Sequence, residues 1–477
     1  MLDTLATTDV TTDRPRELRP AALLVAVALG VVADIGVRGD PANLVLAIAL
    51  GGLIIVLLAT RALRAPARLL LAATFVPVAM LALRVSPWLT ASNLVLTVAL
   101  IASALLFGRS GSLFAATPAT WLRRLGPAAG AVVDVGHDAV AAVGPIGGRH
   151  AVGLKRVARA VAITLPFLVL ALLLLADADV VFARLITPDL DIGVGIGHGV
   201  VIVIAACFVV AAGGVARRIE AHDTDRAGGF GVLEAVTMLG SMAAVLAAFV
   251  VAQLIALTGA GERLVRDAGL TPAEYARSGF FQLCWAVLVV TALLAVVRRA
   301  CAPHTLDRRA IRWLQAAVPL LTIGLVVVSL RRMAYYDEAF GLTMLRVWVI
   351  GATVWIGVML AVLAIRNLAF PRARWVGGIA LLCSYVLIVV ANAANPEAYV
   401  VHHNTARSRS GASVDLRYLG TLSDDAVPQI ATTFRHDPAG VRRLVGCANA
   451  AGVSRVNLAV ERASEVRASV CRRRTSP

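Results

Sequence analysis

Residues 312–366 read RWLQAAVPLLTIGLVVVSLRRMAYYDEAFGLTMLRVWVIGATVWIGVMLAVLAIR, and this stretch decides the fold. It holds two apolar runs, near 312–330 and 342–365, separated by a charged and aromatic connection from Arg331 to Glu338. An apolar run of about 17 to 25 residues can cross a hydrocarbon core of about 30 Å as a helix. Because the bilayer offers the backbone no hydrogen-bond partner, the stretch favours two transmembrane helices joined outside the membrane.

Comparable apolar runs recur on both sides of this stretch, and apolar residues make up 59% of the 477-residue chain. Soluble globular chains have an apolar share of about one half. The sequence therefore predicts an all-α fold, a polytopic helical membrane protein with about eleven transmembrane helices. The predicted spans lie near residues 20–37, 41–60, 68–86, 89–108, 160–176, 196–216, 231–257, 279–297, 312–330, 342–365 and 374–392.

The distribution of basic residues predicts the orientation of these spans. The formal net charge is +16, and most arginines lie in short connections rather than on a soluble basic face, so we expect no nucleic-acid partner. One alternating set of connections holds 24 Lys and Arg residues and the opposite set holds 8. Basic residues near span ends resist translocation. We therefore expect a cytoplasmic N-terminus and an extracytoplasmic C-terminus.

This topology divides the chain into five parts. We expect a cytoplasmic N-terminal tail (1–19), a four-helix membrane segment (20–108), a basic cytoplasmic loop (109–159), a seven-helix membrane segment (160–392) and a small helical extracytoplasmic tail (393–477). No Walker, Rossmann or zinc motif occurs in the sequence, so we expect no cofactor and no metal.

Polar residues within the predicted spans gather toward the outer ends of the helices. They are Asp34, Asp177, Asp179, Gln253, Gln282, Arg346 and Asn392. Ion-coupled transporters generally place substrate and coupling sites near the midplane. An almost empty midplane therefore disfavours a coupled transporter, although an uncoupled permease remains an alternative.

Asp177 and Asp179 end the fifth predicted span, and three interpretations stay open for them. They can mark a solvated helix end, share a divalent cation if the backbone leaves helical geometry, or pair with an arginine such as Arg346.

The connection that contains Arg332 and Tyr336 also has two interpretations. Tyrosines are enriched at membrane interfaces, where they anchor helices. The mixture of both charges with paired tyrosines also fits part of an outward-facing polar site.

The C-terminal tail begins with a helix signal. Asn395-Pro396-Glu397 has the pattern of an N-cap, a proline at the first helical position and an early acid, so a helix carrying Tyr399 should start directly after the last span. Ser423-Asp424-Asp425 is a second cap signal, and residues 455–471 have a helix-like composition. The tail has few large apolar residues, so we expect it to lean on the membrane domain.

Cys447 and Cys471 lie in this tail. Outside the cytoplasm a disulfide between them is chemically allowed.

Several segments together resemble a known family. They are Ala178-Asp179-Val180-Val181-Phe182, residues 273–280 with Glu274, Tyr275 and Arg277, Tyr336 through Thr343 with Arg346, Asn395 through Tyr399, and residues 415–428. The chain resembles the bacterial membrane proteins grouped as domain of unknown function 4153/4173 over roughly residues 160–435. The resemblance implies a bacterial plasma-membrane protein and brings no established activity.

These observations leave three hypotheses for the function. The first is a non-enzymatic envelope protein, a binding, scaffold or regulatory protein that contacts membrane lipids and an envelope protein or lipid-linked ligand. The second is a transferase acting on a lipid-linked donor at the outer face, with Asp177 or Asp179 as the catalytic acid. The third is a transporter or permease. The candidate outward-facing site comprises Asp177, Asp179, Glu274, Tyr275, Arg277, Arg332, Tyr336, Arg346, Asn395 and Tyr399.

Overall fold

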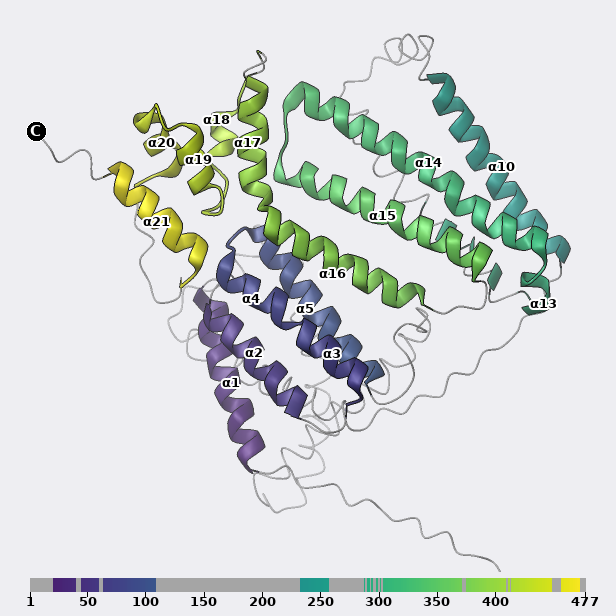
Figure 1. The fold of residues 1–477 in the computed structure, drawn as a ribbon, viewed down its shortest axis with the longest axis horizontal. Coiled ribbons are helices and arrows are strands. Elements are labelled where there is room, and N and C mark those ends of the chain that lie inside the picture. Colours follow the sequence, from purple (N-terminus) through teal and green to yellow (C-terminus); the bar gives the residue numbers. More distant parts are fainter. Residues whose placement is uncertain are drawn as a thin grey trace, which may run out of the picture.

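A computed structural model describes most of the predicted membrane domain and tail (Figure 1). The described residues are 20–39, 44–59, 63–108, 232–256, 303–370, 375–408, 413–447 and 456–471, with single positions between 287 and 301 and at 411. Every secondary-structure element in these ranges is a helix. The all-α prediction is therefore confirmed for the described residues.

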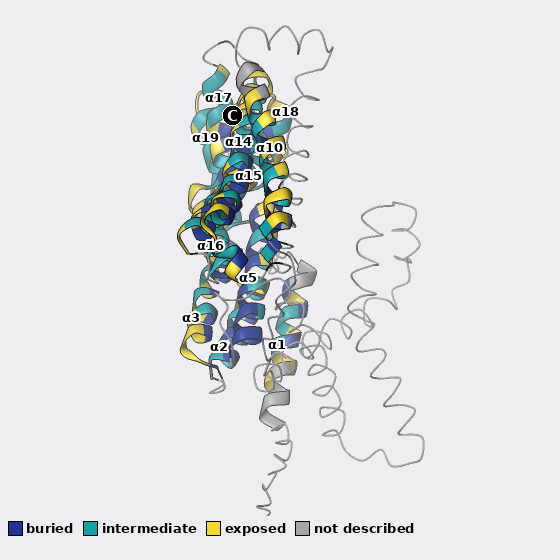
Figure 2. Cartoon of the chain, turned by 90° about the vertical axis from the view of Figure 1, so that its right-hand side faces the viewer, coloured by how far each residue is buried: buried dark blue, intermediate teal, exposed yellow. Residues whose placement is uncertain are grey.

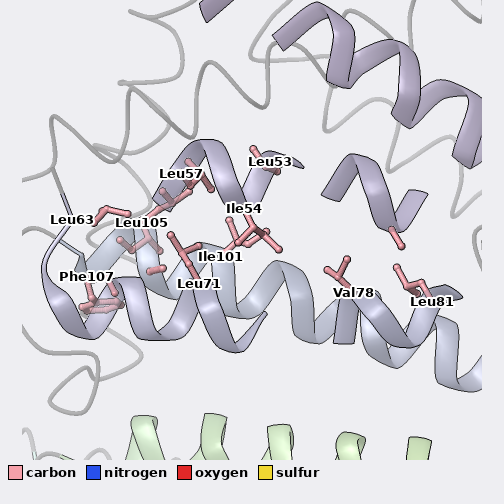
Figure 3. Packing of buried hydrophobic residues seen from close by; sticks show 14 of the residues in the cluster. Leu53, Ile54, Leu57, Leu63, Leu71, Val78, Leu81, Ile101, Leu105 and Phe107 are labelled. Carbon is pink, nitrogen blue, oxygen red and sulfur yellow. The ribbon is translucent and has the colours of Figure 1, made fainter. Parts of the chain in front are cut away.

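The first group of helices forms a bundle with its own apolar core. It consists of α1 (Pro20–Gly39), α2 (Leu44–Ala59), α3 (Ala65–Ala73), α4 (Phe75–Leu83) and α5 (Pro87–Phe107). Figure 3 shows side chains of α2, α3 and α5, among them Ile54, Leu71 and Ile101, pointing toward one another. Ile54 and Leu71 have no exposed surface, so both lie fully inside this core.

The second group comprises α10 (Val232–Ala256), the short α13 (Pro303–Leu306), α14 (Arg309–Phe340), α15 (Met344–Ala369) and α16 (Val376–Ala394). Helices α14 and α15 form a hairpin, and α10 packs along α14 (Figure 1). Helix α16 contacts α15 on one side and α4 and α5 on the other. It therefore joins the two groups.

Two amides fix the contact between α16 and the N-terminal bundle. The Asn93 Nδ2 donates to Asn392 Oδ1 at 3.0 Å, and the Asn392 Nδ2 donates back to Asn93 Oδ1 at 2.9 Å. Both side chains are buried. Among apolar helices, a reciprocal amide pair holds α5 and α16 in one register.

The tail forms a separate layer of short helices at one end of the molecule (Figure 1). These are α17 (Pro396–Ser408), α18 (Leu416–Leu419), α19 (Val427–Thr433), α20 (Pro438–Val445) and α21 (Leu458–Cys471). Val401, Leu419, Ala426 and Ile430 make a small core. Helix α17 also contacts α15, and α21 contacts α4, so the tail leans on the larger helices as expected.

Five helical stretches are long and apolar enough to cross a membrane. They are Ala65–Leu83, Pro87–Phe107, Arg309–Phe340, Met344–Ala369 and Val376–Ala394. Many residues of these helices are exposed (Figure 2), and large apolar residues are among them; Leu69 and Val95, for example, are 72% and 69% exposed. Such exposure suits a lipid environment, and the chain is a membrane protein.

Described helices also coincide with most of the predicted spans. Helices α1, α2, α5, α10, α14, α15 and α16, and α3 together with α4, lie on eight of them. The predicted spans 160–176 and 196–216 and most of 279–297 lie outside the described residues.

One predicted boundary is wrong. The sequence predicts a connection from Arg331 to Glu338, but α14 continues through it and ends only at Phe340. No glycine or proline interrupts these residues, and the helix ends at Gly341, whose positive φ of 74° is readily adopted only by glycine. Arg332 and Tyr336 therefore lie on the last turns of a long helix, and the turn shortens to Gly341–Thr343.

Two prolines inside helices leave a carbonyl without its usual donor, and in each case a neighbouring helix supplies one. Pro77 cannot donate to the carbonyl of Ala73, and the helix is interrupted at Thr74 between α3 and α4. The Tyr385 hydroxyl of α16 donates to this Ala73 carbonyl at 3.2 Å.

Pro319 in α14 likewise leaves the carbonyl of Gln315 without the backbone N–H that would donate to it in a regular helix. The Asn367 Nδ2 of α15 donates to that carbonyl at 2.9 Å. Since neither lipid nor an apolar core can satisfy an orphaned carbonyl, these two side chains allow the prolines to remain within long apolar helices.

The Tyr385 contact predicts a mutational cycle. Tyr385→Phe should lower the free energy of unfolding by about 1 to 2 kcal/mol, because it leaves the Ala73 carbonyl unpaired. In a Pro77→Ala background the same substitution should cost much less, since the backbone N–H restored at this position can donate to that carbonyl. Unfolding of the four purified proteins in one detergent measures the coupling, and equal costs in both backgrounds would contradict this account.

Candidate functional site

The ends of several helices meet the tail at one place. The N-terminus of α5, the turn between α14 and α15, and the junction of α16 with α17 all lie beside α18 and α19 (Figure 1). Several tail residues make polar contacts there, and we call five of them the tail junction: Glu397, Asn404, Tyr418, Ser423 and Asp425.

Asp425 binds the start of α5. Its Oδ2 accepts hydrogen bonds from the backbone N–H groups of Val85 and Ser86, each at 2.8 Å. Its Oδ1 lies 3.3 Å from the Arg84 guanidinium, and the Asp425 side chain is 1% exposed. A carboxylate at a helix N-terminus pairs donors that the helix itself cannot satisfy and interacts favourably with the helix dipole. Asp425 therefore connects the tail to the N-terminal bundle.

Glu397 lies beside it in the first turn of α17 and is 2% exposed. Its Oε2 accepts from the Ser423 backbone N–H at 2.7 Å and from the Ser423 hydroxyl at 2.6 Å. Burial raises the pKa of the Glu397 carboxyl above its usual 4.5, and the negative Asp425 raises it further.

Hydrogen bonds oppose these effects on Glu397. Those from Ser423 lower the pKa, and so does the nearby Ser86 hydroxyl, although no hydrogen bond of normal geometry joins it to the carboxylate. Two buried carboxyls thus lie close together, and the Asp425 carboxylate is the one that pairs with Arg84.

Asn404 and Tyr418 hold the turn between α14 and α15. The Asn404 side chain accepts from the Leu342 N–H and donates to the Leu342 carbonyl, both at 2.8 Å. The Tyr418 hydroxyl accepts from the Met344 N–H at 2.7 Å. Burial raises the pKa of Tyr418. A Cβ at Gly341 would come within 2.7 Å of Asn404 Oδ1, so glycine is required by space as well as by its φ.

Three predicted site residues adjoin this junction. Asn395 adopts a left-handed conformation, caps α17 by accepting from the Ala398 N–H at 3.2 Å, and donates to the Asp425 carbonyl at 2.9 Å. The predicted helix start at Asn395 is therefore confirmed.

The other two residues are Arg346 and Tyr336. The Arg346 guanidinium lies 4.0 Å from the centre of the Tyr336 ring and donates to the Gly341 carbonyl.

Two other candidates lie at the edge of the junction. Tyr399 is 52% exposed, and its ring centre is 5.9 Å from that of His403. Arg332 lies one turn before Tyr336 on α14. Asp177, Asp179, Glu274, Tyr275 and Arg277 lie outside the described residues, so their predicted roles stay predictions.

The sequence did not assign Glu397 and Asp425 to the site. It explained both as acids of helix caps, yet α19 begins at Val427 without a side-chain cap, so the cap assigned to Ser423-Asp424-Asp425 is wrong. The Asp425 carboxylate reaches α5 instead, and Ser423 donates to Glu397. Both acids lie within segments that resemble the family, and this position was the feature of the sequence that could have indicated their importance.

The described residues contain no group of three His, Cys, Asp or Glu side chains that could hold a metal ion. His403 pairs with Asp337 of α14, its Nε2 lying 2.9 Å from Oδ2, while its neighbour His402 is exposed. The two histidines thus point to different surroundings.

A disulfide joins Cys447 to Cys471, the pairing that the sequence allows. It ties the end of α21 to the segment after α20. At the other end of α21, Asn457 donates to the carbonyls of Leu81 and Arg84, each at 2.9 Å, and so satisfies the C-terminus of α4. The last helix is therefore held at both ends.

A family model described as domain of unknown function (DUF4153) matches residues 70–433. The matched region runs from within α3 to the end of α19 and includes the whole tail junction. The resemblance found in the sequence is thereby confirmed. No curated protein and no solved structure matches the chain.

Asp425→Ala should lower the free energy of unfolding by about 3 kcal/mol, because it leaves the buried N–H of Ser86, the partly buried N–H of Val85 and Arg84 without their acceptor. Asp424→Ala is the matched control, since Asp424 forms a more exposed pair with Arg467 and should cost about 1 kcal/mol or less. Unfolding in one detergent measures both. Equal losses would show that the contacts of Asp425 with α5 have no special weight.

The raised pKa of Glu397 predicts a pH dependence. The folded protein holds this proton more tightly than the unfolded chain, so the free energy of unfolding should rise as the pH falls from neutral toward 4.5 and gain nothing further below that. Glu397→Gln should lack this component. The measurement is the difference in unfolding free energy between wild type and variant across this range, and a constant difference would refute the assignment.

Proposed function

The chain belongs to the family defined by domain of unknown function DUF4153, and from this premise we propose a function based on its own contacts. We propose that it is a multi-pass protein of the bacterial plasma membrane, with about eleven spans, that acts as a binding or scaffold protein of the cell envelope. In this proposal the tail is a fixed platform on the outer face.

The hydrogen bonds that the two buried acids accept from their own chain carry this proposal. Glu397 and Asp425 accept hydrogen bonds from Ser423, Val85 and Ser86 of their own chain and are 2% and 4% exposed. A general acid, base or nucleophile must reach its substrate. These carboxyls instead bind one part of the chain to another, which supports a structural role for the junction.

The orientation rests on the excess of arginine in alternate connections, with the tail on the side poor in basic residues. The bonded pair Cys447 and Cys471 supports this side, since disulfides persist in oxidising compartments and are rare in the cytoplasm.

Exposed side chains of the tail offer the binding surface. Tyr399 and Leu416 are 52% and 48% exposed, and His402 and Arg417 are exposed on the same short helices. Aromatic and arginine side chains are the residue types enriched at protein interfaces. We propose an envelope protein or a lipid-linked anionic ligand as the partner, besides the surrounding membrane lipids. The transferase alternative depends on Asp177 and Asp179, and no contact among the described residues favours it or a transporter.

Impermeant maleimide labelling tests the platform. In a variant with the other unpaired cysteines replaced, Ser413→Cys should react on intact cells, because Ser413 is exposed on the tail. Ser110→Cys, in the basic loop predicted to be cytoplasmic, should react only after lysis. Labelling of Ser413→Cys only after lysis would overturn the proposed orientation.

Cross-linking in cells distinguishes a binding platform from an enzyme. A photoreactive amino acid in place of Tyr399 should capture a discrete envelope partner or lipid-linked molecule in cells, whereas one in place of Arg309, at the far end of α14, should not. Turnover of a lipid-linked donor by the purified protein, abolished by Asp177→Asn or Asp179→Asn at normal protein level, would replace the scaffold proposal by the transferase.

A further inference from the structure

The end of α14 and α15 opposite the Gly341 turn carries a cluster of nitrogen donors. The Arg366 guanidinium donates to Asn367 Oδ1 at 3.1 Å, and the Arg298 guanidinium lies 3.5 Å from the same oxygen. The Asn367 Nδ2 donates to the Gln315 carbonyl. We call Arg298, Arg312, Gln315, Arg366 and Asn367 the arginine cluster.

Two donors of the cluster have no acceptor among the described residues. The Gln315 side chain is 2% exposed, and its Nε2 makes no hydrogen bond. The Arg312 Nε is also buried without an acceptor. Arg312 precedes Gln315 by three residues, so the two share one face of α14. Since an unpaired buried donor is costly and rare, this pair calls for an acceptor from outside the chain.

The charge at this end favours an anion. Arg298, Arg312 and Arg366 bring three cations together here, whereas the acidic residues of the described segments at this end are Glu234 of α10 and Asp307, which precedes α14. Arginine forms paired hydrogen bonds with the oxygens of phosphate groups.

Aromatic residues place this end at the level of lipid headgroups. Trp313, beside Arg312, is 51% exposed, and Phe370, at the end of α15, is 54% exposed. The Phe370 ring lies 6.2 Å from that of Trp375, at the start of α16. Tryptophan and other aromatic residues are enriched where the hydrocarbon meets the headgroups, and basic pockets between transmembrane helices bind anionic headgroups.

We propose that the arginine cluster is a binding site for the phosphate group of an anionic phospholipid, with Arg312 and Gln315 donating to its oxygens and Arg366 and Arg298 adding charge. Asn367 holds Arg366 in place. It also joins α15 to α14, because its side chain donates to the Gln315 carbonyl that Pro319 leaves without a backbone donor. The site lies at the other end of the α14–α15 hairpin from the tail junction and is independent of the platform function.

Lipid retention by the full-length protein tests the site. Native mass spectrometry of protein exchanged into mixed micelles should find phosphatidylglycerol retained over phosphatidylcholine of the same chain length. Arg312→Gln should bind phosphatidylglycerol about tenfold more weakly, because a hydrogen bond to a charged group is lost. Gln315→Met, which keeps the size of the side chain, should weaken binding about fivefold. Arg309→Gln is the matched control, because it removes an exposed charge at the same end and should bind as wild type does.

Thermal unfolding in phosphatidylcholine micelles checks that the variants fold, and phosphatidylglycerol should raise the Tm of wild type and Arg309→Gln more than that of Arg312→Gln. Equal retention by Arg312→Gln and Arg309→Gln would overturn the proposal. Stabilisation of wild type by inorganic phosphate alone to the same extent as by phosphatidylglycerol would also overturn it, since the ligand would then be a free anion.

Discussion

Each backbone polar group within a membrane must find its partner inside the protein, and this constraint governs the structure. The two internal prolines show it most directly, because each removes a donor that lipid cannot replace. Tyr385 and Asn367, both on neighbouring helices, supply the missing hydrogen bonds. The carbonyls that the prolines leave unpaired are therefore the points at which neighbouring helices form side-chain hydrogen bonds. Packing of apolar faces alone would leave the relative rotation of these helices much less defined.

A related requirement acts at the tail junction, because the N–H groups at the start of a helix have no acceptor within the helix. The start of α5 and the turn before α15 expose N–H groups where the helices end, and Asp425, Asn404 and Tyr418 of the tail accept from them. The cost is a pair of buried carboxyls, Glu397 and Asp425, of which Asp425 pairs with Arg84. Their environment resembles that of a catalytic pair in burial and in the raised pKa of Glu397. Donors of the chain itself nevertheless bind both groups, which favours a structural role for them.

Local patterns predicted much of this structure. Long apolar runs located the described membrane helices, and the order of asparagine, proline and acid located the start of α17. The role of Asp425 could not be predicted, because its partners lie 339 and 340 residues away in sequence and its neighbours form a convincing cap pattern. The charged residues from Arg331 to Glu338 led to the wrong prediction of a connection. They continue α14, which ends only at Gly341. A side chain that binds its own helix end can be predicted from sequence, whereas one that binds a helix end far away in the chain cannot.

The reciprocal amides of Asn93 and Asn392 have a consequence for how this family can diverge. Replacing either asparagine with an apolar residue strands the other amide in a buried, apolar contact, whereas replacing both leaves no polar group to satisfy. We expect the two positions to change together among relatives. The N-terminal helices and α16 would then drift in sequence as one unit, even though 299 residues separate the two positions.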